Sequence, residues 1–424
     1  MTASATARRG FRVARGSCNP GGMTSAPASP RPTIRLRPKT NPRAIRHGFP
    51  WVYDNEVVTD RRTKALPPGT IALLEDEERR PLGTVAVTPA SRIFARMLDR
   101  DPTAEIDRAW LVARIARAFA HRARLYDAPF YRLIHAEADG LPGVIVDRFG
   151  DTAVIQPNAA WAEAMIADLS AALADVTGVT AIVKNATGRA RGLEGLDEET
   201  GIIAGRIDGP LPVPMNGATY LADLLGGQKT GLFYDQRPNH AFAARLAGDA
   251  RVLDVFSHVG GFSLAALAGG AASALAVDGS APALELAEGG ARAMGMGDRF
   301  ATRKGDAFAV MEALRGEGAQ FDLVICDPPA FAPARPALEA GLRAYERVAR
   351  LAAPLVAPGG FLVLCSCSHA ADLTQFRNAS ARGLGRGGRR SQLIHTGFAG
   401  PDHPQLPQLA ETGYLKALFF RLDG

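Results

Sequence analysis

Cysteine is scarce in this sequence, and long apolar runs are missing from it. The 424 residues include four cysteines, at positions 18, 326, 365 and 367, which are too few for a disulfide framework in a chain of this length. No stretch reaches the roughly 18 uninterrupted apolar residues of a membrane span, and the N-terminus lacks the compact apolar segment of a secretory signal. We therefore expect reduced thiols and a cytoplasmic protein that does not enter a membrane.

Acidic residues are absent from the first 50 positions, which hold ten Lys or Arg. The rest of the chain carries 39 basic and 43 acidic residues, so the net charge of +6 comes from this one segment. Such a segment is attracted to phosphate backbones, but a solvated tail has the same composition. An organellar transit peptide and a translation start at Met23 also remain open. We treat residues 1–32 as a disordered basic extension outside the fold.

The length of the chain predicts several domains, because one hydrophobic core rarely organises so many residues. Residues 33–103 contain short β-branched or aromatic runs separated by turn-forming residues, which predicts a small β-rich domain. Residues 104–215 begin with an apolar stripe over 104–125 that predicts a connecting helix. A helix over 161–173 among further strand candidates then indicates a central α+β domain. The strand candidates of both regions are residues 33–36, 49–53, 70–74, 82–87, 143–146, 153–156 and 181–184.

The remaining residues, 216–424, change to a repeated order of strand, turn and helix. Short apolar runs alternate with helix-length segments rich in Ala, Leu and Glu, which is typical of buried parallel strands joined by crossover helices. The sequence therefore predicts an α/β, Rossmann-like domain. Its expected strands are residues 252–256, 274–277, 321–326, 361–365 and 414–420.

The ends of the first three of these strands favour a nucleoside-bearing cofactor. Asp254 precedes a turn that contains Gly260 and Gly261, where the backbone can approach a ligand closely. The spacing is not G-x-G-x-x-G, so a dinucleotide is disfavoured. Asp278 ends the second strand and can accept bonds from ribose hydroxyls, while Asp306 follows the third and could meet an adenine edge. Singly each carboxylate is more often a helix cap, but together they point to one site.

The ends of the next two strands carry residues suited to methylation of a pyrimidine. Asp327 is followed by two prolines that make a stiff turn, and Phe331 offers a stacking surface for a base. A cytosine C5 becomes nucleophilic only after a thiolate adds to C6, which requires a cysteine at this edge. Cys367 lies nearer the loop and is the favoured nucleophile, whereas Cys365 is expected inside the strand. Asp327 is the candidate base for the C5 proton.

These cysteines also have two plainer interpretations. Free cysteines are commonly buried in a core without any chemical role. Cys365, Cys367 and His369 alternate and could in principle hold zinc, but a structural zinc site needs four ligands and no second cluster exists in the sequence. We therefore predict no metal.

Several motifs together resemble one known family. The segments Gln228–Arg237, Asp254–Ser263, Asp327–Phe331 and Cys365–His369 are similar to the bacterial class I 23S rRNA cytosine-C5 methyltransferases of the PUA-domain type. The likeness extends to Arg132–Gly143, Pro401–Pro404 and Tyr414–Lys416, so that it covers residues 33–424. The resemblance implies an N-terminal PUA-like domain, a central α+β domain and a class I methyltransferase domain that binds S-adenosyl-L-methionine (SAM). It also places the Gln228–Arg237 segment in the cofactor pocket.

The resemblance and the strand-end analysis together give the candidate site residues. The catalytic candidates are Cys367, Asp327 and Cys365. The cofactor candidates are Asp254, Phe256, Gly260, Gly261, Asp278, Ser280, Asp306, Asp327, Phe233, Asp235, Gln236 and Arg237. Two stretches depart from the family: residues 382–390 are rich in Gly and Arg where a regular helix is expected, and residues 185–191 are a looser match. The first departure predicts an altered end of the domain.

The predicted function is methyl transfer from SAM to C5 of a cytosine in 23S rRNA or a large-subunit precursor, with the base turned out of its stack. One alternative is methylation of a guanine ring nitrogen on the same scaffold, which needs no thiol. The other is a non-catalytic RNA-binding factor for ribosome assembly. RNA is the expected partner in every case, and a homodimer is left open.

Overall fold

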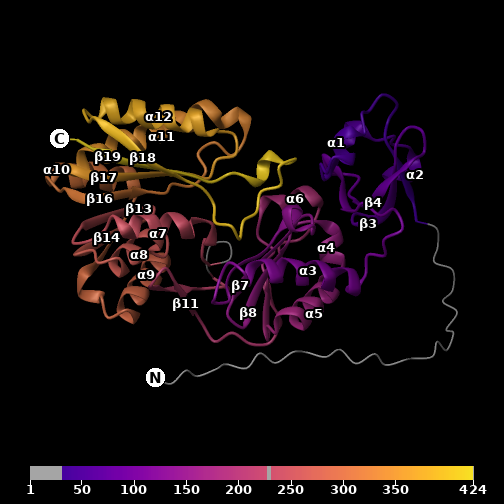
Figure 1. Cartoon of the computed structure of the whole chain (residues 1–424), viewed down its shortest axis with the longest axis horizontal. Helices are drawn as coiled ribbons and strands as arrows, with labels where there is room; N and C mark the ends of the chain where they lie inside the picture. Colours follow the sequence, from indigo (N-terminus) through magenta and orange to yellow (C-terminus); the bar gives the residue numbers. More distant parts are fainter. Residues whose placement is uncertain (1–30, 227–230, 424) are drawn as a thin grey trace, which may run out of the picture.

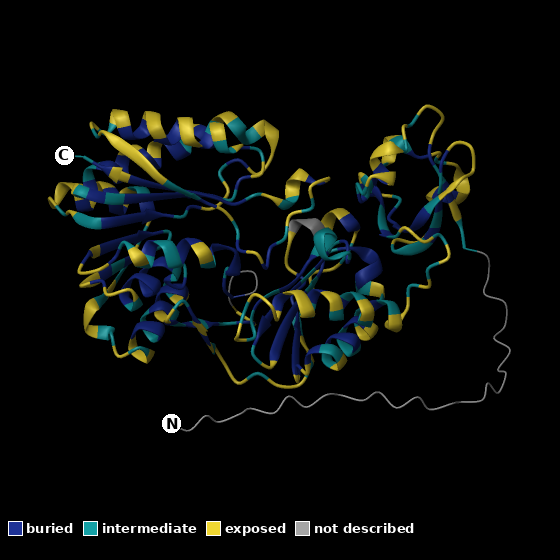
Figure 2. Ribbon diagram, viewed as in Figure 1, coloured by how far each residue is buried: buried dark blue, intermediate teal, exposed yellow. Residues whose placement is uncertain are grey.

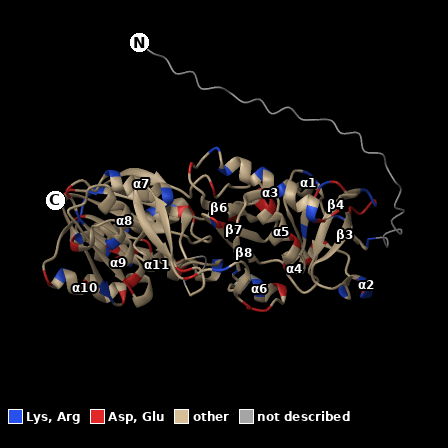
Figure 3. Cartoon of the chain, turned by 90° about the horizontal axis from the view of Figure 1, so that it is seen from below, with Lys and Arg blue, Asp and Glu red and all other residues tan. Residues whose placement is uncertain are grey.

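The computed structural model describes residues 31–226 and 231–423, and three regions follow one another along its long axis (Figure 1). The basic extension over residues 1–32 falls almost wholly outside the described residues, as do Gln228 to Thr230 of the predicted cofactor segment. Each region has its own sheet with a buried interior and an exposed outer layer (Figure 2). Lys, Arg, Asp and Glu are spread over all three regions (Figure 3). No helix in the described ranges has the length and apolar character needed to cross a membrane.

The N-terminal region is a five-stranded sheet in the order β1-β3-β4-β5-β2. β1 and β3 are parallel and the other pairs are antiparallel. The four predicted stretches coincide with β1 to β4, whereas β5 was not predicted. Two short helices, α1 (Arg43–Arg46) and α2 (Arg61–Lys64), accompany the sheet. The strands are β1 (Thr33–Arg35), β2 (Trp51–Tyr53), β3 (Thr70–Glu75), β4 (Pro81–Val87) and β5 (Ile93–Asp99).

The central region is a second five-stranded sheet, in the order β10-β9-β8-β7-β6. Helix α3 (Arg108–Arg122) buries its apolar stripe, including Leu111 and Ile115, and packs on α5, so it belongs to this region and does more than connect. The predicted helix over 161–173 is divided at Met165 into α4 (Ala160–Ala164) and α5 (Ile166–Thr177). The strands are β6 (Phe130–His135), β7 (Val144–Phe149), β8 (Thr152–Pro157), β9 (Ala181–Lys184) and β10 (Gly201–Ala204), and a short helix α6 (Arg189–Glu194) precedes β10.

The C-terminal region is a seven-stranded sheet in the order β15-β14-β13-β16-β17-β19-β18. The strands β13 to β17 are parallel, and β19 lies antiparallel between β17 and β18. The chain runs from β13 outward in one direction and then returns to start β16 on the other side. The strands are β13 (Arg251–Val255), β14 (Ser273–Asp278), β15 (Phe300–Lys304), β16 (Phe321–Cys326), β17 (Val356–Ser366), β18 (Ser391–Gly397) and β19 (Lys416–Leu422).

Helices cover the faces of this sheet, as expected for a doubly wound α/β fold (Figure 1). A hairpin, β11 (Leu211–Met215) with β12 (Ala218–Ala222), precedes them, and β12 packs against α8 and α9. The helices are α7 (Arg237–Arg245), α8 (Gly261–Ala268), α9 (Ala281–Ala293), α10 (Ala307–Gly316), α11 (Leu338–Ala352) and α12 (Leu373–Arg386). In doubly wound sheets a ligand lies beyond the carboxyl ends of the strands where the strand order reverses, here between β13 and β16.

The Gly- and Arg-rich stretch over 382–390 does not interrupt the domain, so the prediction of an altered end was wrong. Helix α12 continues through it to Arg386. A Cβ on Gly383 would lie 2.4 Å from the carbonyl oxygen of Glu346, so the missing side chain allows α12 to pack closely on α11. Close packing here outweighs the low helix propensity of glycine.

The segment over residues 398–415, which we call the strap, joins β18 to β19 and extends over the central region towards the N-terminal region (Figure 1). Arg122 of α3 donates to the carbonyl oxygen of Asp402 at 2.8 Å, and the backbone N–H of Arg132 donates to the Asp402 carboxylate at 3.1 Å. Farther on, Gln408 lies beside Gly48 of the N-terminal region. The strap therefore links the seven-stranded sheet to both preceding regions.

Candidate functional site

The loop after β13 is held in an unusual backbone conformation at the point where the strand order reverses. Phe256 and His258 have φ values of 63° and 50°, in the left-handed region that residues other than glycine rarely adopt. Gly260 follows at 79°. Conformations of this kind cost about 1 to 3 kcal/mol per residue and cluster at ligand sites. The loop is therefore a candidate ligand cradle on its backbone geometry alone.

Asp254 stabilises the end of this loop through a hydrogen bond to the start of α8. It is buried at the end of β13, and its Oδ2 accepts the backbone N–H of Ser263 in the first turn of α8 at 2.9 Å. Burial raises the pKa of this carboxyl to about 6. In the structure, Asp254 therefore stabilises the first turn of α8.

Asp278 connects the loops that follow β13 and β14. Its Oδ2 accepts the N–H of His258 at 2.9 Å, and its Oδ1 accepts the N–H of Ser280 at 2.8 Å. Each carboxylate oxygen has two lone pairs, so both can still accept from a ligand hydroxyl. Asp278 therefore combines a structural role with the capacity expected of a ribose-binding acid.

Two further cofactor candidates are helix caps. The Oδ1 of Asp306 accepts the N–H of Ala309 at 3.0 Å and caps α10. The Oγ of Ser280 accepts the N–H of Ala283 at 3.3 Å and caps α9. Both residues are exposed at the same edge of the sheet. The capping role is evident in the structure, and contact with the cofactor stays a prediction.

The two glycines of the loop differ in what surrounds them. A Cβ on Gly261 would lie 2.8 Å from the ring of His240, so its missing side chain serves internal packing. A Cβ on Gly260 would lie 3.1 Å from Ala287 and Leu264, and its positive φ also favours glycine. The pair shapes the turn into α8.

Aromatic rings from three strand ends form an apolar floor beside these acids. The ring of Phe256 lies 6.3 Å from that of Phe308 and 6.4 Å from that of Phe331, and the last two are 6.4 Å apart. Carboxylates that accept from a ribose, next to rings that can stack on a purine, are the groups that an adenosine moiety needs. The residues present fit SAM.

Asp327, at the end of β16, is positioned by side chains from a distant segment. Its Oδ2 accepts from Nε2 of Gln236 at 3.0 Å, and Oε1 of Gln236 accepts from Nδ2 of Asn239 at 2.6 Å. Gln236 and Asn239 are both buried. The Asp327 carboxylate is therefore fixed at the reversal of strand order.

The other residues of the 233–237 segment contact protein groups. Asp235 accepts from the Tyr414 hydroxyl at 2.6 Å. Arg237 donates to the carbonyl oxygen of Phe130 in the central region. Phe233 lies with its ring 5.1 Å from that of His258, next to the cofactor loop. The segment thus links the central region and the strap to the site.

The two candidate cysteines occupy different environments. Cys365 is buried within β17, and burial raises the pKa of its thiol well above the usual range. Cys367 follows the last residue of β17 and is partly exposed. Thiolates are the reactive form, and a buried apolar site suppresses them. Of the two, Cys367 is the one that solvent reaches.

A hydroxyl network holds the backbone on both sides of Cys367. Ser366 Oγ donates to the Tyr345 hydroxyl at 2.9 Å, and that hydroxyl lies 2.7 Å from Ser368 Oγ. Ser368 Oγ also accepts the N–H of Ala332 at 2.9 Å. Tyr345 comes from α11 and was not predicted, because no spacing in the sequence relates a residue on this helix to the cysteine loop.

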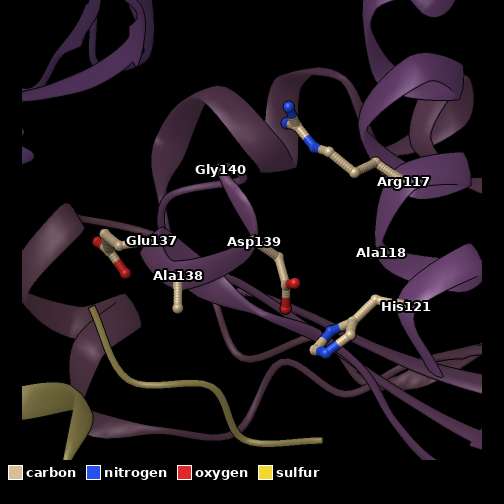
Figure 4. Close-up of a pocket in the computed structure, with 7 residues that line it drawn as sticks. All are labelled: Arg117, Ala118, His121, Glu137, Ala138, Asp139 and Gly140. Atoms are coloured by element: carbon tan, nitrogen blue, oxygen red, sulfur yellow. The ribbon is translucent and has the colours of Figure 1, made fainter. Parts of the chain in front are cut away.

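Two hollows on the surface of the described residues lie away from this edge. One of about 350 Å³ opens between α3, which contributes Arg117 and His121, and the short helix η2 (Ala136–Asp139), which contributes Glu137 and Asp139 (Figure 4). Asp139 is already paired with Arg122 at 2.6 Å. None of the candidate residues lines this hollow, and the strand ends identify the site better than surface shape does. Within the described ranges, no group of three or more His, Cys, Asp or Glu could hold a metal ion.

Comparisons with known proteins identify the two outer regions. A family model described as S-adenosylmethionine-dependent methyltransferase matches residues 203–421, and a PUA-like domain model matches residues 34–100. A ribosomal RNA large subunit methyltransferase of Deinococcus radiodurans is 36% identical over 416 residues, covering 94% of this chain and 100% of the relative. Ribosomal RNA large subunit methyltransferase I of Cronobacter sakazakii is 33% identical over 383 residues, covering 89% and 96% respectively.

Solved structures share the fold over nearly the whole chain. A Streptococcus mutans protein named as a SAM-dependent methyltransferase has a TM-score of 0.77 at 17% identity, covering 92% of this chain and 100% of that one. A methyltransferase solved in complex with S-adenosylhomocysteine (SAH) has a TM-score of 0.78 at 17% identity, with 93% and 100% covered. The predicted fold class and the SAM cofactor are confirmed. The chain belongs to the SAM-dependent large-subunit ribosomal RNA methyltransferases that carry an N-terminal PUA-like domain.

Proposed function

We propose that this enzyme forms 5-methylcytosine in 23S rRNA or its large-subunit precursor, with Cys367 as the nucleophile. The relatives are named for large-subunit rRNA, which supports the choice of substrate and a cytoplasmic site of action. The observation that carries the cytosine assignment is a partly exposed thiol, Cys367, at the end of β17, the strand next to the one that presents Asp327. The PUA-like region and the central region would engage the RNA around the target.

Cys367 begins the reaction in this proposal. Its thiolate Sγ bonds to C6 of the cytosine, and the electron pair of the C5–C6 double bond becomes available at C5 to take up the methyl group. SAM supplies an electrophilic methyl on a sulfonium, and SAH is released. When the C5 proton is removed, the C5–C6 double bond is restored and the C6–Sγ bond breaks, which regenerates the thiolate.

Asp327 is the proposed base for the C5 proton, and Gln236 orients it. The hydrogen bond from Gln236 fixes one carboxylate oxygen, and the carboxylate positioned in this way would take up the C5 proton. Phe331, which follows the stiff Pro328–Pro329 turn, is the proposed stacking surface for the flipped base.

The cofactor is proposed to lie along the edge from β13 to β15. Asp278 would accept the ribose hydroxyls, Asp306 the adenine amino group, and the Phe256 and Phe308 rings would pack against the purine. Asp235 and Arg237 are assigned to positioning because Tyr414 and the carbonyl of Phe130 already engage them. Cys365 is assigned to the core.

Two cysteine variants test the proposal. Bisulfite sequencing of rRNA from cells with and without the gene locates the modified cytosine, and the purified enzyme is then assayed on that RNA with labelled SAM. Cys367→Ala is expected to lower cytosine methylation at least about 1,000-fold, because no thiolate can add to C6. The matched variant Cys365→Ala should stay within about 10-fold of wild type. Full activity of Cys367→Ala, or a methylated guanine, would overturn the proposal.

A further inference from the structure

Lys416 is a buried cation that the proposed chemistry has not used. It is the first residue of β19 and pairs in register with Ser366, the last residue of β17. Only 6% of its surface is exposed. Its Nζ donates to the carbonyl oxygens of Ser368 and Ala371, both at 2.7 Å. These hydrogen bonds fix the backbone of the residues that follow Cys367.

Two carbonyl partners do not neutralise the charge of Lys416. A buried ammonium is costly unless a negative charge lies near it. Lys416 interacts electrostatically with Cys367, which is negative in its thiolate form, and more weakly with the carboxylate of Asp372 at the start of α12. Burial lowers the pKa of Lys416, and the thiolate opposes that shift. A charged Lys416 and a charged Cys367 therefore stabilise one another.

Two phenols also interact with Cys367. Tyr345 approaches from α11, and Tyr414 comes from the strap directly before β19. Burial raises the pKa of both, so each is neutral near pH 7. His369 packs its ring 5.4 Å from that of Tyr414. Of the groups shown to interact with Cys367, Lys416 is the one that carries a full positive charge.

We propose that Lys416 is the positioning residue of the Cys367 nucleophile: its ammonium fixes the loop after β17 and favours the thiolate over the thiol. The inference rests on the proposed function, because it assigns a partner to the same cysteine. A lysine near a thiol lowers the pKa of that thiol and increases the fraction of thiolate at neutral pH. The ε-amino group acts here through its charge and two hydrogen bonds, without touching the substrate.

Alkylation of Cys367 as a function of pH tests the pairing without any substrate. The full-length protein carrying Cys365→Ala is treated with iodoacetamide, and mass spectrometry follows the peptide that contains Cys367. Replacing Lys416 with Met is expected to raise the pH of half-maximal alkylation by about one unit or more, because the thiolate loses its cation. Lys416→Arg keeps the charge and should fall between wild type and Lys416→Met.

Methylation assays supply the second measurement. Lys416→Met should lower the rate about 10-fold or more at pH 7 and recover part of that loss at pH 9, where the thiolate forms without help. Lys416→Gln replaces Lys416→Met if the latter does not fold, as judged by its melting curve. An unchanged alkylation profile in a folded neutral variant, or a loss of activity that is equal at all pH values, would overturn the proposal.

The two proposals fail in different ways. If Cys367→Ala abolishes cytosine methylation while Lys416→Met leaves the alkylation profile unchanged, the role of Lys416 is refuted and the nucleophile stands. If alkylation shifts as expected but Cys367→Ala remains active, the charge pair exists and the nucleophile assignment is refuted, which removes the function proposed for Lys416.

Discussion

The two halves of the strand-end site are built in different ways. On the side of β13 to β15, acidic side chains accept backbone N–H groups from residues at most 20 positions away in sequence, as Asp278 does from His258 and Ser280. On the side of β16 and β17, side chains from distant segments hold the functional groups. Gln236 reaches Asp327 across 91 residues of sequence, and Lys416 reaches Ser368 across 48. We call the side of β13 to β15 the cofactor half and the side of β16 and β17 the reacting half. Contacts between residues close in sequence build the cofactor half, whereas the tertiary fold assembles the reacting half.

This difference suits the tasks of the two halves. A cofactor that is recognised by backbone loops and strand-end acids can be bound by any domain of this topology. The reacting groups must be placed for one substrate, and small displacements there cost large factors in rate. Variants in the reacting half should therefore affect catalysis, and variants in the cofactor half should affect binding and stability.

Among the variants that compare the two halves, the largest effect is expected from Gln236→Leu, which removes the donor to Asp327. Proton removal at C5 should slow about 100-fold or more, because the carboxylate loses its orientation. Single-turnover methylation measures the rate, and calorimetry measures SAM affinity, which should stay within about 2-fold. A comparable loss of SAM affinity would show that Asp327 serves cofactor binding, and the distinction between the two halves would then be wrong.

Asp254→Asn tests the cofactor half through the pH dependence of protein stability. The pKa of this carboxyl is raised to about 6 from an ordinary value of 3.8, so its contribution to stability is complete below about pH 4 and is lost as pH rises through 6. The contribution is about 3 kcal/mol at its full extent. Melting temperatures between pH 4 and 7.5 should fall more steeply for wild type than for the variant. Parallel curves would show that Asp254 titrates normally.

Tyr345→Phe and Tyr220→Phe form a matched pair across the two halves. Tyr345 bonds to Ser366 and Ser368, whereas the Tyr220 hydroxyl donates to the carbonyl oxygen of Gly261 at 3.1 Å. Each loss leaves a buried polar group without its partner and should cost about 1 to 3 kcal/mol in unfolding experiments. Only Tyr345→Phe should also lower the rate constant for methyl transfer. Equal effects of both variants on that rate would contradict the division.

The smallest effect separates the two roles of Asp306. Asp306→Ala removes the cap of α10 and should cost about 1 kcal/mol, while Asp306→Ser retains a capping oxygen. If Asp306 also binds the adenine amino group, both variants should weaken SAM binding about 10-fold. Wild-type affinity in Asp306→Ser would leave Asp306 as a cap alone.

The same division explains what the sequence could predict. The strands β13, β14 and β16 and the residues at their ends follow from local patterns, and the predicted fold was confirmed. Local glycine content misled the prediction for α12, because its packing on α11 is a tertiary effect. The strands β5, β6, β10, β11, β12 and β18 were missed. Tyr345 was missed as well, and Tyr414 and Lys416 were noticed only as part of the last predicted strand and of the family likeness, because the fold alone brings them to Cys367.

The position of β19 between β17 and β18 has a consequence for the order of assembly. In this sheet β18 is made before β19 but pairs with it, so neither β18 nor the free edge of β17 can complete its hydrogen bonds until β19 inserts. Non-local pairings of this kind form late in folding. Lys416 is the first residue of β19, so it reaches the loop after β17 only when β19 inserts. If Lys416 favours the thiolate as proposed, a chain still emerging from the ribosome would carry Cys367 without its cation, and the full reactivity of the thiol would appear only once β19 has inserted.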